Sequence, residues 1–476
     1  MIFHLLPFYN RLNDIIESPY RKFSKKITDK AGDSALCSKL GDFEMTIDNV
    51  RKYFNHKKNT YKSDEEHAEE FQQLANGVFQ AEGYIGGHFK SGLNFYPLCT
   101  VTQLLSEESI EFFIRLNNNL SNKGTVSITL NSFNKFVIHF RLSGWNVFFS
   151  EFIPYFYMLY GAKYDAIAKL TRIYKIKESI QQSKDEMLIV ELISLAYSLT
   201  AHASRYKLSL KNKLISLNIK PELLDNLPQI SSTENTILPS FLFLLGFFLG
   251  DGTLHLKLEW REKNKTIVII PTLSIDQSAV ESNIKVMNYL LEVLNINGVS
   301  ARLHKRADVN VYVLNASGIE NIFINLFPLL EKHVELLYWK SDSFKLFTWV
   351  KTLTEIGGHH TYLGLSLLIE KLYSNTHERL TEKKTWVERL DIWLKTVNSR
   401  RDAGNYYIYP IYVANTREVR GWQVRFATSL TLPEKSNRAF MCSSHGGSAK
   451  ALELAISYRE IVIFEMLERA GLTSQY

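Results

Sequence analysis

Two acidic residues, each followed directly by a glycine, are the groups in this sequence best suited to chemistry: Glu82 before Gly83, and Asp251 before Gly252. If the fold brought the two carboxylates to about 4 Å, they would repel by roughly 4 kcal/mol at an effective dielectric constant near 20. A cation would relieve that repulsion, and carboxylate oxygens with open coordination positions suit magnesium. Magnesium beside a phosphate can activate water and stabilise the leaving oxygen, so the pair indicates phosphodiester hydrolysis.

The segments that end in these acids predict two closely packed helices. Small residues recur four positions apart in each segment, at Gly77 and Ala81 and again at Gly246 and Gly250. This spacing places them on one helix face, where two backbones can approach, and the glycine after each acid can end its helix. One segment alone would favour an ordinary packing helix. Two copies favour a helix pair whose ends bring the acids together.

An internal repeat surrounds the two acids. The segment Pro97 to Gln103 matches the segment Pro271 to Gln277. Further matches keep the same spacing of 174 positions: Gly124 with Gly298, Ser143-Gly144 with Ser317-Gly318, and Pro154 with Pro328. Proline, glutamine and glycine rarely agree in one ungapped register by chance, so we expect two copies of one structural unit.

Each copy predicts helix, two strands, helix, two strands, helix. Leu254 to Arg261 alternates without a break, which places His255, Lys257, Glu259 and Arg261 on one face. The same alternation occurs at 126–131, 135–142, 299–304 and 309–313. Each copy therefore predicts an antiparallel sheet with one polar, partly basic face, although solvent exposure alone would produce the same pattern.

The two acid-bearing segments resemble the LAGLIDADG motifs of homing endonucleases and intron maturases, and the resemblance covers about residues 67–178 and 237–353. It implies an α+β fold in which two pseudo-symmetric αββαββα repeats form antiparallel saddle sheets. The sequence departs from the motif at Asn76, where a small residue is usual, and at Gln80 and Leu249, where the family often has a further acid. That further acid is not the metal ligand, so cleavage remains compatible with the departures.

The resemblance also implies roles for particular residues. The expected catalytic residues are Glu82, Asp251, Lys163, Lys340, Gln103 and Gln277, and the expected magnesium-binding positions are Glu82, Asp251, Gly83 and Gly252. The two lysines match an assisting lysine of the family, with their spacing slipped to 177 positions. An exposed lysine that caps a helix would explain each of them nearly as well. A structural amide at the end of a strand would likewise explain each glutamine.

A long DNA duplex is the partner that the resemblance implies, bound along the polar strand faces. The residues expected to contact it are His88, Lys90, His139 and Arg141 in the first copy, and His255, Lys257, Arg261, Arg302 and His304 in the second.

From Tyr406 onward the pattern changes to three short strands, 407–412, 421–426 and 438–442, and a helix, 448–470. This segment resembles the plant APETALA2-type DNA-binding module over a short length, and the resemblance implies DNA contacts by Arg420, Trp422 and Arg425. A small accessory domain that packs on the rest of the chain is the alternative. Because the two arginines are five positions apart, a regular strand would send them to opposite faces unless Gly421 lies at a bulge or a strand start.

The chain thus divides into six expected segments. They are an N-terminal extension (1–66), the first repeat (67–178), a helical linker (179–236), the second repeat (237–353), a helical connector with two amphipathic helices (354–405) and the APETALA2-like module (406–476). The polar stretch Ser231 to Thr236 is the expected tether between the two halves.

Composition narrows the classes of protein. With 476 residues, 45% hydrophobic and 22% charged, and a net charge of +7, the sequence is that of a globular protein of several domains that favours polyanionic partners. Three distant cysteines argue against a disulfide framework or a cysteine zinc cluster. The apolar stretch 237–250 is too short to cross a bilayer, so no membrane association is expected. The histidines at 359, 360 and 377 lack acids or cysteines at metal-ligand spacing.

The leading expectation from the resemblance is a magnesium-dependent, sequence-specific DNA homing endonuclease, encoded in an intron and acting as a monomer in a mitochondrion or plastid. A maturase that holds a group I intron RNA on the same scaffold is the alternative. A transcriptional regulator would be expected to have lost the acids, and both are present. An intein is not expected, because the ends lack the splice-junction nucleophile and the terminal asparagine.

Overall fold

The computed structural model describes residues 67–473, with gaps at 132–134, 181–184, 200–208, 228–236, 374–379, 400–406 and 427–436, and a few short pieces between 39 and 60. The tether Ser231–Thr236, His377 and most of the N-terminal extension therefore lie outside the described residues. The described chain forms two compact units. The repeat unit comprises 37–257 and 270–344, and the C-terminal unit includes 258–269 and 345–473. No described helix is both long and apolar enough to span a membrane.

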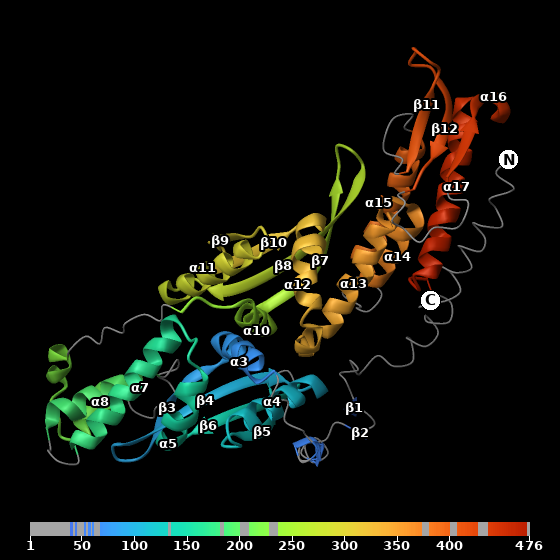
Figure 1. Cartoon of the computed structure of the whole chain (residues 1–476). Coiled ribbons are helices and arrows are strands. Elements are labelled where there is room, and N and C mark those ends of the chain that lie inside the picture. The colour runs from blue at the N-terminus through green and yellow to red at the C-terminus, as the bar shows by residue number, and fades with distance from the viewer. Residues whose placement is uncertain are drawn as a thin grey trace. The chain divides into compact units, whose positions relative to one another are not determined.

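The repeat unit contains most of the two predicted copies, while residues 258–269 and 345–353 of the second copy belong to the C-terminal unit. The order of elements in the copies is the predicted one (Figure 1). The first copy consists of α3 (Ala68–Glu82), β3 (Tyr84–Ser91), β4 (Asn94–Leu104), α4 (Glu107–Asn119), β5 (Thr125–Leu130), β6 (Phe136–Ser143) and α7 (Gly161–Ile180). The second consists of α10 (Phe241–Asp251), β7 (Gly252–Arg261), β8 (Thr266–Ser278), α11 (Glu281–Ile296), β9 (Arg302–Arg306), β10 (Val311–Ser317) and α13 (Ser341–Glu355). The α+β fold class is confirmed.

The two sheets have the same topology, β3-β4-β6-β5 in the first copy and β7-β8-β10-β9 in the second. In both, the strand pairs are antiparallel. One face of each sheet is apolar: Val101, Ile138 and Phe140 are buried in the first copy, as are Ile275 and Leu314 in the second. The opposite face carries the polar residues of the alternating pattern.

The residues that revealed the repeat have a common structural task. After β6 the chain turns at Gly144, with φ 94°, and after β10 it turns at Gly318, with φ 104°. Their N–H groups donate to the carbonyls of Pro97 at 3.2 Å and Pro271 at 3.0 Å. A side chain rarely adopts such φ values, so glycine is needed at both turns. In each copy a short π-helix follows, η2 (Phe148–Phe152) and η5 (Asn321–Leu326).

The copies differ in the length of their first hairpin. Fourteen positions separate Gly83 from Pro97, but nineteen separate Gly252 from Pro271. The extra residues lengthen β7 and β8 relative to β3 and β4. Strand β9 begins three residues and strand β10 two residues later than the alternation predicted, and residues 299–301 form no ladder pairs.

Between the copies, the segment after α7 is helical as predicted where the structure describes it. It includes α8 (Glu186–Ser198), α9 (Leu210–Ile215) and the 3₁₀ helix η4 (Pro221–Asn226). Arg172 of α7 donates two hydrogen bonds to the carboxylate of buried Glu191 on α8, at 2.7 and 2.8 Å. This bidentate ion pair joins α8 to the first repeat, so the insert is attached by a specific contact.

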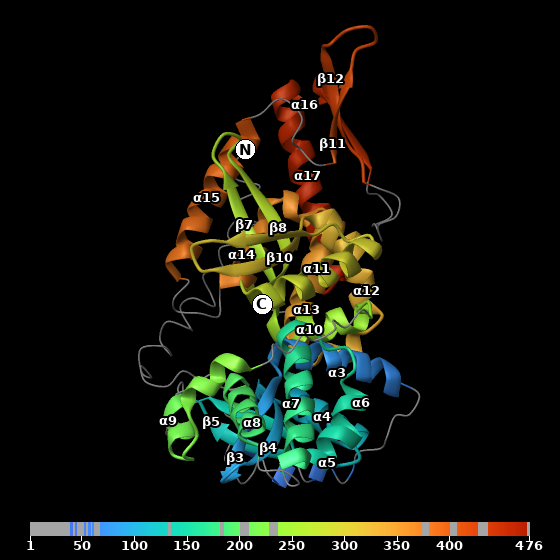
Figure 2. The same cartoon turned by 90° about the vertical axis from the view of Figure 1, so that its left-hand side faces the viewer.

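The C-terminal unit contains the two connector helices, α14 (Tyr362–Tyr373) and α15 (Leu380–Ser399), and an antiparallel sheet ordered β11-β12-β13. Its strands are β11 (Ile408–Tyr412), β12 (Val419–Val424) and β13 (Arg438–Met441), and the chain continues to α17 (Ser448–Arg469). Helix α17 packs on the sheet near its N-terminus, where Ala451 and Ala455 are fully buried. Near its C-terminus, Leu467 lies beside Gly358 of the connector. Figure 2 shows the length of this helix.

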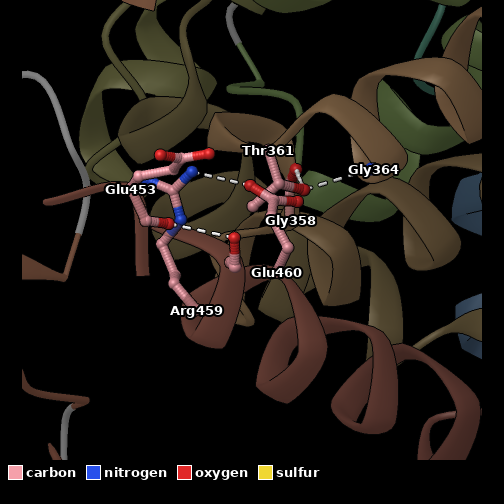
Figure 3. A network of polar contacts seen from close by, with 7 residues as sticks. Gly358, Thr361, Gly364, Glu453, Arg459 and Glu460 are labelled. Atoms are coloured by element: carbon pink, nitrogen blue, oxygen red, sulfur yellow. Dashed lines mark hydrogen bonds and ion pairs between the residues drawn. The ribbon is translucent and has the colours of Figure 1, made fainter. Parts of the chain in front are cut away.

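A buried polar network lies where α17 meets the connector (Figure 3). The Thr361 hydroxyl donates to the carbonyl of Gly358 at 2.7 Å and accepts from the N–H of Gly364 at 3.1 Å. The second bond caps the first turn of α14. Arg459, 2% exposed, forms an ion pair with Glu460 at 2.6 Å. Burial, and then the charge of Arg459, lower the pKa of His360 to about 4, so this histidine is neutral at physiological pH. The network therefore joins α17 to the connector.

Candidate active site

Helices α3 and α10 cross with their backbones in contact, which is the packing that the small residues predicted. A Cβ atom added to Gly77 would lie 2.0 Å from the carbonyl oxygen of Phe243, and one added to Gly246 would lie 1.9 Å from that of Leu74. The two contacts are reciprocal, since Gly77 and Leu74 occupy the same helix positions as Gly246 and Phe243. Any side chain at either glycine would force the helices apart.

The two acids come together at the ends of these helices. Glu82 is the last residue of α3 and Asp251 the last of α10. A Cβ on Gly250 would lie 3.0 Å from the Cγ of Glu82, so the Glu82 side chain runs against the last turn of α10. Desolvation by the surrounding protein and then the charge of Asp251 raise the pKa of Glu82, while Lys163 and Lys340 lower it. Desolvation also raises the pKa of Asp251, against the charge of Lys163.

The glycines that follow the acids end the helices differently from the expectation. Gly83 has φ −72° and ψ 147°, and Gly252 has φ −89° and ψ 155°, so neither is left-handed. Glycine is needed there for space. A Cβ at Gly83 would lie 2.3 Å from the carbonyl of Phe79, and one at Gly252 would lie 2.2 Å from the ring of Phe248. The helices therefore end because the chain passes directly into β3 and β7.

Lys163, at the start of α7, reaches the C-terminal turn of α3. Its ammonium donates to the carbonyl of Ala81 at 3.0 Å and to that of Gln80. Burial lowers the pKa of Lys163 to about 7, against the attraction of Asp251 and Glu82. Lys163 therefore lies beside the acids, as expected. It combines two roles that the sequence left as alternatives, a cation near the carboxylates and a cap on helix carbonyls.

Lys340 stands at the corresponding place in the second copy. Its ammonium donates to the carbonyl of Gly252 at 2.6 Å and lies 5.7 Å from the centre of the Phe248 ring. Burial lowers its pKa, and the charges of Glu82 and Asp251 oppose that shift. Its neighbour Trp339 donates its indole N–H to the carbonyl of Leu249 at 2.7 Å. Trp339 was not among the residues expected at the site, and its position directly before Lys340 is the signal in the sequence that points to it.

The two repeated glutamines behave differently. Strand register places both on the apolar faces of their sheets, Gln103 opposite Ile138 and Gln277 opposite Tyr312. Gln277 donates from its side-chain amide to the carboxylate of Asp251 and accepts at 3.2 Å from Asn283, a contact that the sequence did not reveal. Within the described residues, Gln103 has no corresponding hydrogen bond to Glu82. Only one glutamine of the pair therefore contacts an acid.

The arrangement suits magnesium if the nucleic acid supplies part of the coordination shell. No group of three or more histidine, cysteine, aspartate or glutamate side chains that could hold a metal occurs in the described part of the chain. Magnesium is commonly bound by one or two carboxylates together with water and substrate phosphate, which matches Glu82 and Asp251. The raised pKa values of both acids also indicate that an added cation would stabilise their ionised forms. The Gly252 carbonyl, an expected metal position, accepts from Lys340.

The polar face of the first sheet carries the predicted basic residues. By register, His88 lies opposite Tyr96, Arg141 opposite Thr100, and His139 opposite Thr102. His88, Lys90 and Arg141 are exposed. His139 is half-buried, and its two ring nitrogens lie 2.9 Å from Thr102 Oγ1 and 2.8 Å from Thr129 Oγ1. Burial and then Arg141 lower the pKa of His139, so it adds hydrogen-bonding groups to this face without a charge at neutral pH.

The polar face of the second sheet is more charged. His255, Lys257, Arg261, Arg302 and His304 are all exposed as predicted. Arg302 and His304 on the edge strand β9 lie in the rows of Asn315 and Val313. Arg261 forms an ion pair with Glu259 at 3.4 Å, which reduces its net contribution to the charge of this face.

In the C-terminal sheet, the structure separates Trp422 from the two arginines. Trp422 is 4% exposed, and its indole N–H donates to the Ser448 carbonyl at 3.1 Å. The expectation that it contacts DNA is wrong, because the ring fills the core between the sheet and α17. Arg420 is the extra residue of a bulge, since Ile411 pairs with Gly421 and Tyr412 pairs with Val419. The bulge resets the alternation, so Arg420 and Arg425 return to one face, and both are exposed.

Comparison with known proteins gives similar chains among solved structures. No protein-family model and no curated protein matches the chain. Among solved structures, it is similar to I-SmaMI bound to an uncleaved DNA target in the presence of calcium ions, with a TM-score of 0.48 and 16% identity over 66% of this chain and 97% of that one. It is also similar to the LAGLIDADG homing endonuclease I-LtrWI bound to target DNA, with a TM-score of 0.49 and 16% identity over 64% of this chain and 96% of that one.

Proposed function

We propose that this protein is a magnesium-dependent, sequence-specific endonuclease that cuts both strands of a DNA duplex. One observation carries the proposal: Glu82 and Asp251 end two helices that are in backbone contact, and Lys163 and Lys340 lie at the same helix ends. Two acids and two cations gathered at one end of a packed helix pair match the chemistry of phosphate hydrolysis better than that of a structural core.

In this proposal the two carboxylates hold magnesium, which supplies charge stabilisation and an activated water when it is bound with the phosphates. Lys163 and Lys340 remain beside the carboxylates and attract the phosphate backbone. Gln277, oriented by Asn283, holds the Asp251 carboxylate through a hydrogen bond. The tight crossing of α3 and α10 fixes the separation of the acids and thereby preorganises the site.

Sequence recognition is assigned to the polar faces of the two sheets. Exposed histidine, lysine and arginine side chains there can contact phosphates, and those that reach a groove can contact base edges. The two faces differ in charge and in length, so a single chain would read an asymmetric target as a monomer.

The acids provide the direct test. A cognate duplex, obtained by cleavage selection from a random DNA library, is incubated with magnesium and with wild type, Glu82→Gln or Asp251→Asn. Either variant should retain DNA binding while double-strand cutting falls at least about a thousandfold, because the lost metal ligand contributes several kcal/mol to the transition state. Retention of full cleavage by either variant would refute the assignment of the acids.

The maturase role, the intron origin and the organelle remain predictions. The same variants test the maturase role, because scaffolding of an RNA needs the protein surface and not the metal ligands. Intron splicing that persists with both acids replaced, in the absence of any DNA cutting by wild type, would favour it.

We also propose that the exposed face of the C-terminal sheet contacts DNA outside the cleavage site, as the APETALA2-like pattern implies. Arg420 and Arg425 are the candidate contacts. Replacement of both by alanine should lower affinity and flatten the slope of log affinity against log salt by about one unit for each lost phosphate contact. Cutting at saturating protein should persist. A Glu468→Ala variant, on the exposed surface of α17 and outside the network of Figure 3, serves as the control. Equal salt slopes for wild type, the double variant and this control would make the sheet a packing domain.

A further inference from the structure

Three amide side chains on α3 lie four residues apart and face a segment of backbone: Gln72, Asn76 and Gln80. Asn76 is fully buried and Gln80 is 7% exposed. Buried amides are costly unless they are hydrogen-bonded, so such a row inside a closely packed helix pair calls for partners.

The partners are backbone groups of residues 155–160, the segment that leads into α7. The Tyr155 carbonyl accepts from Gln72 at 3.0 Å and from Asn76 at 2.9 Å. The Asn76 side-chain oxygen accepts from the N–H of Met158 at 2.9 Å. Gln80 accepts from the N–H of Tyr160 at 2.9 Å and donates to its carbonyl at 3.4 Å. The row therefore fixes this segment against α3.

That segment leads directly to Lys163. The N–H of Lys163 donates to the Tyr160 carbonyl at 3.3 Å, and its ammonium reaches the carbonyls of Gln80 and Ala81. Gln80 thus supports Lys163 in two ways. Its side chain binds the backbone of Tyr160, whose carbonyl accepts from the Lys163 N–H, and its own carbonyl accepts from the Lys163 ammonium. A shift of this segment would move the ammonium away from the helix end that carries Glu82.

The second copy has no such row. The helix positions of Gln72, Asn76 and Gln80 are taken there by Phe241, Leu245 and Leu249, and both leucines are fully buried. Lys340 is placed instead beside buried Leu336 and Leu337, with Trp339 bound to the Leu249 carbonyl. The departures of Asn76 and Gln80 from the family motif therefore have a local structural purpose.

We propose that Gln80, supported by Asn76, is a positioning residue that holds Lys163 at the Glu82 end of α3 and controls the cutting of one DNA strand more than the other. The inference rests on the proposed endonuclease function. It follows from symmetry: the strands of a duplex are antiparallel, the two copies are related by a pseudo-twofold arrangement, and each copy contributes one lysine. A support that exists in one copy only should act mainly on one strand.

The test replaces Gln80 with leucine, the residue that Leu249 provides in the second copy. A cognate duplex carries a different dye on each strand, and both cuts are followed under single-turnover conditions with magnesium. Gln80→Leu should slow one strand at least tenfold and the other less than threefold, so that nicked DNA accumulates, with unchanged affinity for the duplex. Gln80→Glu keeps the acceptor for the Tyr160 N–H and should recover most of the lost rate. Equal slowing of both strands, or no slowing, would overturn the proposal.

A second measurement is independent of cleavage. Acetic anhydride labels lysines at neutral pH, and mass spectrometry reports the rate at each site in the full chain. Release of Lys163 from its two carbonyls in Gln80→Leu should raise its labelling several-fold, while Lys340 stays within the error of wild type. If wild type cuts no selected duplex but this difference appears, the endonuclease proposal fails and the positioning role stands. If wild type cuts DNA and the labelling of both lysines is unchanged, the positioning role fails alone.

Discussion

The helix end that carries Glu82 and the one that carries Asp251 have different supports. In the first copy, a row of amides holds the chain before Lys163, and two helix carbonyls receive its ammonium. In the second, apolar side chains occupy that row. Hydrogen-bonding support comes there from Trp339, which donates to the Leu249 carbonyl, and from Gln277, which binds the acid itself. The two copies agree where the backbones touch and differ where side chains surround the acids. Pseudo-symmetry is thus required by the helix crossing and is not required by the surroundings of each acid.

The largest effect is expected at the crossing, where the copies agree. Gly77→Ala and Gly246→Ala each place a Cβ about 2 Å from a backbone carbonyl of the other helix. Overpacking against rigid backbone should lower the free energy of unfolding by about 3 kcal/mol or more, and by similar amounts in both variants. Urea denaturation of the purified protein measures this. Glu292→Ala, on the exposed side of α11, is the control. A loss at one glycine only would contradict the reciprocal crossing.

A smaller effect should separate the two glutamines. Gln277→Ala removes a hydrogen bond to the Asp251 carboxylate, and bonds to charged groups contribute about 1.5 to 3 kcal/mol, so the cleavage rate should fall roughly ten- to hundredfold. Gln103→Ala removes no such bond to Glu82 among the described residues and should change the rate less than about threefold. Single-turnover cleavage of the same duplex compares them. Equal losses would mean that DNA binding brings Gln103 to Glu82.

The smallest expected effect is the pH dependence of stability in the metal-free protein. The folded-state pKa of Lys163 lies near 7, below its unfolded value, so the unfolded chain binds more protons between about pH 7 and 10. Stability contributed by this site should therefore rise with pH across that window. Lys163→Met should remove about 1 to 2 kcal/mol of that rise, a figure reduced for partial solvent contact.

Lys340→Met is the matched variant from the other copy. Burial lowers its pKa too, with the same sign, but the protein encloses Lys340 less completely than Lys163, so the desolvation that lowers the pKa is weaker. Its effect on the pH profile should be the smaller of the two. Urea denaturation at pH 7, 8 and 9 measures both, and a larger effect for Lys340→Met would reverse the ranking.

The sequence predicted the fold well because the constraints on it are local and repeated. Gly77, Gly246, Gly144 and Gly318 each answer a backbone demand that only glycine meets, and such demands leave the same residue type in both copies. Alternation then assigned strand faces without a template. The acids were found because both copies carry an acid before a glycine, whereas the lysines were found through the family resemblance.

What the sequence could not predict depends on contacts between distant residues. Gln80 meets Tyr160 only because the segment before α7 runs along α3, and no spacing reveals that. Trp422 was assigned to DNA from the resemblance to the APETALA2-type module, but its large apolar ring is buried against α17. Asn283 orients Gln277 across a strand end and a helix start. In each case the pattern gave the residue, and the packing gave its partner.

Helix α17 has a consequence for engineering of the C-terminal unit. The same helix lies under the three-stranded sheet at Ala451 and Ala455 and against the connector near Leu467, with no break between them. The distance between the two attachments and their relative rotation about the helix axis are therefore set by the number of residues between them. One residue inserted between them would advance the sheet by about 1.5 Å and turn it by about 100° around the helix axis, and four would nearly restore its facing at about 6 Å greater reach. The direction in which Arg420 and Arg425 point relative to the connector therefore depends on the number of residues in this helix.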